Sequence, residues 1–194
     1  MTVQYTNRTG KTYYLREGKT KTGKPRYFFS VQPDGKGKPV EEIPESFEIY
    51  ENPTDARVFL RKKRPQLITD AEKQLVEKYV SKLKSSKQYL VDCKGEFITI
   101  YESNADIEHL KNTFGELFKT VSLPEGLDGN ESLDTLLNAM NQYYTGMMRF
   151  RLVDKERRSF IAERFCFRGS IDDWMEISSP KTLKKLAKKY IKHL

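Results

Sequence analysis

The chain has little cysteine and little histidine, with two of each among 194 residues. Cys93 and Cys166 are too few for a disulfide framework or for a four-ligand metal site. No apolar run approaches the roughly 18 residues that a membrane-spanning helix needs. The polar and aromatic start, MTVQYTNRTGKTYY, does not resemble a secretory signal. These absences predict a cytoplasmic protein without a membrane partner.

Catalytic signatures are equally scarce. The sequence contains no GxSxG nucleophile motif, and the glycine- and lysine-rich stretch 18–24 lacks the GxxxxGK[ST] order of a phosphate-binding loop. Metal-dependent cleavage needs converging carboxylates, and the chain offers only loosely spaced ones: Asp154, Glu156, Glu163, Asp172 and Asp173. We expect no catalytic residue, no metal and no cofactor, and a metal-dependent nuclease is kept as a third hypothesis.

What the sequence does have is positive charge. It holds 35 Lys and Arg against 27 Asp and Glu, a net charge of +8, and its isoelectric point is about 9.3. The sign of the charge alternates in blocks along the chain. The charged side chains of residues 1–38 are mostly basic, and residues 39–56 contain acidic but no basic side chains. The charged side chains of residues 57–64 are basic again. Such blocks either form separate patches or neutralise each other across a sheet, and the pattern alone does not choose.

The first 66 residues have the pattern of a small antiparallel sheet. The turn-rich segment 18–24 lies between two stretches of β-favouring residues, which predicts a hairpin with a basic tip. Asn52-Pro-Thr-Asp55 marks the turn of a second hairpin. The expected strands are 10–17, 25–31, 47–50 and 58–60. We therefore predict a small antiparallel β domain over residues 1–66.

After residue 66 the pattern alternates between helices and hairpins. Thr69 and Glu72 form the capping box of an amphipathic helix that runs to about Lys84. Ser179 and Pro180 are the expected N-cap and first residue of a C-terminal helix. Two further helices are predicted over 104–118 and 133–143, and two hairpins over 88–101 and 147–167. These elements form a predicted α+β domain over residues 67–194.

The predicted fold class is therefore α+β. An N-terminal three- or four-stranded antiparallel sheet is followed by helices packed on antiparallel hairpins.

Rings and cations are expected to share one side of the N-terminal sheet. Side chains alternate between the two faces of a strand, so Tyr14, Arg16, Arg26 and Phe28 are predicted on one face. Such a surface suits nucleic acid, because cations neutralise phosphates while rings stack on exposed bases. The alternative is that the aromatic side packs on the helical half and only the hairpin tip stays in water.

Arginine and lysine also cluster near the C-terminus. Between residues 149 and 168 the chain has six arginines, for which an internal ion-pair network with Glu156, Glu163, Asp172 and Asp173 is favoured over phosphate binding. The C-terminal helix has a lysine-rich side opposite an apolar one, and a solvated face is the favoured interpretation.

The leading hypothesis is a non-catalytic nucleic-acid-binding protein, with DNA or RNA as the partner. The second is a protein-interaction or regulatory subunit that binds no nucleic acid. The residues predicted to contact nucleic acid are Arg16, Lys19, Lys21, Lys24, Arg26, Arg61, Lys62, Lys63 and Arg64.

Overall fold

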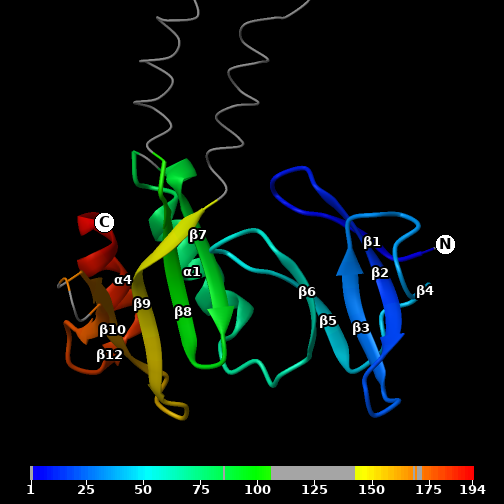
Figure 1. The fold of residues 1–194 in the computed structure, drawn as a ribbon. Helices are drawn as coiled ribbons and strands as arrows, with labels where there is room; N and C mark the ends of the chain where they lie inside the picture. Colours follow the sequence, from blue (N-terminus) through cyan, green and yellow to red (C-terminus); the bar gives the residue numbers. More distant parts are fainter. Residues whose placement is uncertain (1, 85, 106–142, 168, 170–171) are drawn as a thin grey trace, which may run out of the picture.

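The computed structural model describes residues 2–84, 86–105, 143–167, 169 and 172–194. Of these residues, 44% lie in strands and 16% in helices. The described strands form three antiparallel sheets, accompanied by the two α-helices α1 and α4 (Figure 1). The described part of the chain is therefore mostly β.

The N-terminal sheet has four strands and is built around β2 (Thr12–Lys19). One edge of β2 pairs with β3 (Pro25–Ser30), and the other edge pairs with β1 (Gln4–Thr6) and β4 (Lys38–Pro39). The first predicted hairpin is thereby confirmed. Its turn has Gly23 at φ +78°, a conformation that glycine adopts without steric cost.

The second predicted hairpin is also present, but it forms a sheet of its own. β5 (Phe47–Glu51) pairs with β6 (Val58–Lys62), and the pair packs beside β3 through the rings of Tyr27 and Phe47, whose centroids are 5.7 Å apart. Asn7 holds the other end of the hairpin by donating from Nδ2 to the carbonyl of Ala56 at 2.8 Å. Residues 2–62 thus comprise two sheets joined by side chains.

The largest sheet has six strands in the order β11-β10-β9-β8-β7, with β12 also paired to β10. β8 and β9 pair along their length, although residues 104–143 separate them in sequence. This pairing joins two hairpins that sequence patterns identify separately. The strands are β7 (Tyr89–Lys94), β8 (Phe97–Ser103), β9 (Tyr144–Asp154), β10 (Ser159–Cys166), β11 (Asp173–Glu176) and β12 (Lys181–Thr182).

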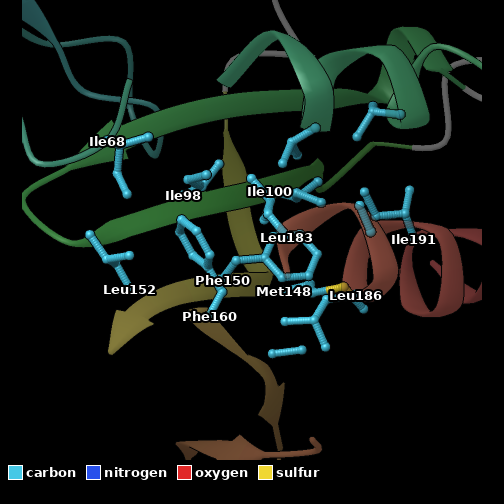
Figure 2. Packing of buried hydrophobic residues seen from close by; sticks show 14 residues of the cluster. Ile68, Ile98, Ile100, Met148, Phe150, Leu152, Phe160, Leu183, Leu186 and Ile191 are labelled. Atoms are coloured by element: carbon cyan, nitrogen blue, oxygen red, sulfur yellow. The ribbon is translucent and has the colours of Figure 1, made fainter. Parts of the chain in front are cut away.

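The main core lies between this sheet and the helices. α1 (Asp70–Val80) and α4 (Leu183–Tyr190) supply apolar side chains that meet those of β8, β9 and β10, as Figure 2 shows. Two short 3₁₀ helices, η1 (Ser86–Gln88) and η2 (Ile191–His193), complete the helical structure of the described residues. The largest fully buried side chains of the cluster are Phe150, Phe160, Ile68, Ile98, Ile100, Met148, Leu186 and Ile191.

The predicted fold, in which helices pack on antiparallel hairpins after an N-terminal sheet, is wrong. The hairpins pair with each other into one continuous six-stranded sheet, and the described chain contributes only two short α-helices. The physical reason is that the long strand β9 has neighbours on both edges, β8 and β10. The helices predicted over 104–118 and 133–143 fall almost wholly on 106–142, outside the described residues.

The two described helices differ in how well their starts were predicted. The capping box of α1 is confirmed, because Thr69 and Glu72 exchange hydrogen bonds with each other's backbone. The C-terminal helix begins at Leu183 instead of after Ser179, and its N-cap residue makes no side-chain cap. Lys181 and Thr182 form the short strand β12, which pairs with β10. Because these two residues are in a strand, the helix begins after them.

Deleting a core ring is expected to destabilise the sheet strongly. We predict that Phe150→Ala lowers the free energy of unfolding by about 3–5 kcal/mol, because the side chain is fully buried and leaves a cavity. Urea denaturation measures the change. Phe167→Ala is the matched control, since Phe167 is 62% exposed and its loss is expected to cost under about 0.5 kcal/mol. Equal costs for the two variants would contradict the core assignment.

Glu72 connects α1 to the turn between β9 and β10, and this link predicts a dependence of stability on pH. Arg158 donates from Nε to Glu72 at 2.9 Å, and the Thr69 backbone donates at 2.9 Å. Burial alone would raise the pKa of Glu72, but these hydrogen bonds together lower it below its ordinary value of 4.5. The carboxylate therefore stabilises the fold above that value, and this contribution is lost as the pH falls through the lower folded pKa.

We predict that Glu72→Gln costs about 2 kcal/mol of unfolding free energy at pH 7, and that the difference from the unmodified protein shrinks toward pH 3. Urea denaturation across this range measures it. Glu77→Gln is the control, because Glu77 makes only an exposed pair with Lys73 at 3.6 Å. A difference that stays constant down to pH 3 would show that the Glu72 charge is not the cause.

Candidate nucleic-acid interface

The tip of the β2–β3 hairpin places four cations in solvent. Lys19 ends β2, Arg26 lies near the start of β3, and Lys21 and Lys24 lie in or beside the turn between them. All four side chains are exposed, and none has an ion pair among the described residues. Thr20 closes the turn by accepting a hydrogen bond from the Gly23 backbone at 2.9 Å. The tip is thus an ordered turn with its charges facing water.

The second basic segment, residues 61–64, leaves the end of β6. Lys62, Lys63 and Arg64 are exposed. Arg61 differs, because its Nε donates to Glu48 at 2.7 Å and its guanidinium lies 3.8 Å from the centroid of the Tyr50 ring. Three of the four cations are thus available to a partner, and the fourth is held by the hairpin.

The two basic segments lie at the same end of the molecule. Tyr27 follows Arg26 and packs on Phe47, and Phe47 is opposite Lys62 in the β5–β6 ladder. In Figure 1 the β2–β3 tip and the segment that follows β6 point in the same direction. We call this surface the basic edge and define it by seven residues: Lys19, Lys21, Lys24, Arg26, Lys62, Lys63 and Arg64.

Arg16 is not part of the basic edge. It lies in the middle of β2, opposite Phe28 of β3 and Pro39 of β4. Arg16 is only 6% exposed, and its Nε has no hydrogen-bond partner among the described residues. The alternation of side chains placed Arg16 on the basic side, but in the structure this residue is buried.

The ion pairs of Glu48, Glu51 and Asp55, in the acidic segment 39–56, do not involve the basic edge. Glu51 pairs with Arg8 at 2.8 Å, and Asp55 pairs with Arg57 at 3.4 Å. Glu48 holds Arg61, as described above. These three carboxylates therefore pair with arginines outside the basic edge.

A cleft of about 660 Å³ adjoins the basic edge, between the β5–β6 hairpin and the turn from β7 to β8. The rings of Tyr50 and Phe59 form part of its wall. Three carboxylates, those of Glu48, Asp70 and Asp92, also line it. Its five cations are Arg61, Lys62, Arg64, Lys73 and Lys94. The cleft is therefore more positive than negative, and it shares Lys62 and Arg64 with the basic edge.

Polar groups in the wall of the cleft are linked to each other. The Tyr50 hydroxyl donates to Asp92 at 3.2 Å. Burial raises the pKa of Tyr50, and the Asp92 charge raises it further. Burial also raises the pKa of Asp92, although the Tyr50 hydrogen bond and Arg61 oppose this change. Burial raises the pKa of the Cys93 thiol to about 12, so this cysteine is protonated near neutral pH and is a poor nucleophile.

The arginines of β9 are used inside the protein. Arg149 and Arg151 both donate from Nε to Glu163, a residue only 4% exposed. The Arg149 guanidinium also lies 4.3 Å from the ring centroids of Phe97 and Trp174. The predicted ion-pair network is thus confirmed for Glu163, and these two arginines are not free to bind phosphate.

The lysines of α4 form a separate charged surface. Lys184, Lys185 and Lys188 are exposed, whereas Leu183 and Leu186 on the opposite side are buried. In Figure 1 α4 and the N-terminal sheet lie at opposite sides of the molecule. These lysines therefore provide a natural control for the basic edge.

No protein-family model, curated protein or solved structure matches the chain. Within the described ranges, no group of three or more His, Cys, Asp or Glu is arranged to hold a metal ion. No helix of the described part is long and apolar enough to cross a membrane.

Sequence reasoning missed the cleft. Lys73 lies within the helix predicted to run to about Lys84 and Lys94 within the hairpin predicted over 88–101, and both line the cleft together with Lys62 and Arg64. No local pattern connects these segments, because their proximity comes from packing between the β5–β6 hairpin and the six-stranded sheet.

Proposed function

We propose that this protein binds nucleic acid without catalysis, through the basic edge. The observation that carries the proposal is that two segments some forty residues apart bring seven exposed cations to one end of the molecule. Neutralising phosphates with these cations releases condensed counterions, which favours binding.

The chemistry of the basic edge supports contact with the backbone of nucleic acid more than readout of base sequence. Five of its seven residues are lysines, whose ammonium groups act as point charges without the planar fork of arginine. Phosphate contacts of this kind position a strand but distinguish few sequences. We therefore expect salt-dependent binding with Kd values on the order of 10⁻⁴ to 10⁻⁶ M at physiological salt.

A protein-interaction role is the second candidate, and one observation favours it. Phe167 is 62% exposed, and its ring packs edge-on against Phe165, which in turn contacts Trp174. Exposed aromatic clusters of this kind are common in protein interfaces. The two candidates differ in their response to salt, because an apolar interface survives high ionic strength while phosphate contacts are screened.

Removing the charges of the hairpin tip is expected to weaken nucleic-acid binding. We predict that the quadruple variant Lys19→Gln, Lys21→Gln, Lys24→Gln and Arg26→Gln binds single-stranded and duplex oligonucleotides at least tenfold more weakly at low salt. The slope of log K against log salt for duplex DNA is expected to become shallower by up to about 3.6, since each phosphate contact contributes about 0.9. Fluorescence anisotropy at several salt concentrations measures both quantities.

The matched control removes the same number of charges from the other side of the molecule. Lys184→Gln, Lys185→Gln, Lys188→Gln and Lys192→Gln change exposed residues at the C-terminal end, so the net charge falls equally but the basic edge is intact. We expect this variant to keep most of the affinity. Equal losses in both variants would show that only net charge matters, and the absence of binding in the unmodified protein would rule the function out.

A further inference from the structure

We propose that the cleft beside the basic edge binds one unpaired nucleotide of the bound strand, with its base against Phe59 and its phosphate on the surrounding cations. This inference rests on the proposed function and adds a site for a single nucleotide to it. The cleft volume of about 660 Å³ lies within the usual range for sites that hold small ligands.

Phe59 provides the stacking surface. Phe59 is 46% exposed although it lies in the wall of the cleft. It is directly opposite Tyr50 in the β5–β6 ladder, and the Tyr50 ring is already covered by the Arg61 guanidinium. Phe59 is therefore the ring with area left for a base, and base stacking on such a ring changes affinity by roughly 5- to 150-fold.

Cations from three elements line the same cleft as this ring. Lys62 ends β6 and Arg64 follows it, Lys73 comes from α1, and Lys94 ends β7. Because Lys62 and Arg64 also belong to the basic edge, a strand that follows the edge arrives at the cleft. Charges that converge from three elements suit a phosphate better than they suit a neutral ligand.

Asp92 supplies the group that can discriminate between bases. Its carboxylate accepts hydrogen bonds from the Tyr50 hydroxyl and the Cys93 backbone, and a carboxylate has capacity for more. Carboxylates accept hydrogen bonds from exocyclic amino groups, as on cytosine N4, and adenine and guanine also have such groups. Uracil and thymine lack them. The cleft is therefore expected to favour cytosine, adenine and guanine over uracil and thymine.

The test measures binding of nucleoside 5′-monophosphates to the full chain by isothermal titration calorimetry or by NMR shifts. We expect saturable binding of GMP and CMP, weaker binding of UMP, and much weaker binding of inorganic phosphate. Phe59→Ala should weaken GMP binding by roughly 5- to 150-fold, while Phe59→Trp, which keeps an aromatic ring, should retain it. Phe167→Ala is the control, because this exposed ring lies outside the cleft.

Two outcomes overturn the inference. One is that GMP binds no more tightly than inorganic phosphate, and the other is that Phe59→Ala leaves GMP binding unchanged. If Phe59→Ala fails to fold by circular dichroism, Lys94→Gln replaces it, since Lys94 is an exposed residue at the end of β7 in the wall of the cleft. This variant should also weaken GMP binding, and an unchanged affinity overturns the inference equally.

Failure of the inference and failure of the proposed function give different results. If oligonucleotides bind the protein but mononucleotides do not, the cleft inference is wrong and the basic edge stands. If mononucleotides bind but oligonucleotides do not, the proposed function is wrong, and so is the inference that the cleft holds part of a bound strand. Binding of both, with the hairpin-tip variant losing only oligonucleotide affinity, supports both proposals.

Discussion

The positions of the cations depend on how the β5–β6 hairpin packs between its two neighbours. On one side the Tyr27 and Phe47 rings hold it against β3, and on the other side the Tyr50 hydroxyl binds Asp92 of β7. The first contact brings the hairpin tip and residues 61–64 together, and the second forms the cleft. A change in either contact would separate charges that now face the same solvent, so the proposed binding surface depends on a few ring contacts and one hydrogen bond.

Arginine and lysine have different roles in this protein. Arg8, Arg61 and Arg151 each bind a carboxylate, and most of the ion pairs among the described residues use arginine. The guanidinium is weakly hydrated and planar, so it pairs and stacks at lower desolvation cost than an ammonium group. Lysines such as Lys19 and Lys63 stay in water. Ion pairs within the fold therefore use mainly arginines, and the lysines stay exposed to a polyanion. This agrees with binding that depends on the charge of the nucleic acid more than on its base sequence.

The sequence predicted the features whose causes are local. The first hairpin, its basic tip and the capping box of Thr69 and Glu72 depend on residues a few positions apart, and all are present. The pairing of β8 with β9 was missed because it joins segments separated by some forty residues. Burial of Arg16 was missed for a similar reason, since alternation gives the face of a strand but does not show what covers that face. The cleft combines three elements, so no single segment indicates it.

The basic edge and the cleft are complementary in physical terms. An array of lysines holds a strand weakly and lets it slide, because phosphate contacts differ little from one register to the next. Once a strand is held on the basic edge, binding of one of its nucleotides in the cleft would be an intramolecular second step. The effective concentration of that nucleotide at the cleft would then be high. Stacking on Phe59 needs a base whose face is exposed, whereas the bases of a duplex stack on each other. A protein that combines the two surfaces would therefore distinguish single strands from duplexes by base exposure, although both carry the same kind of charge.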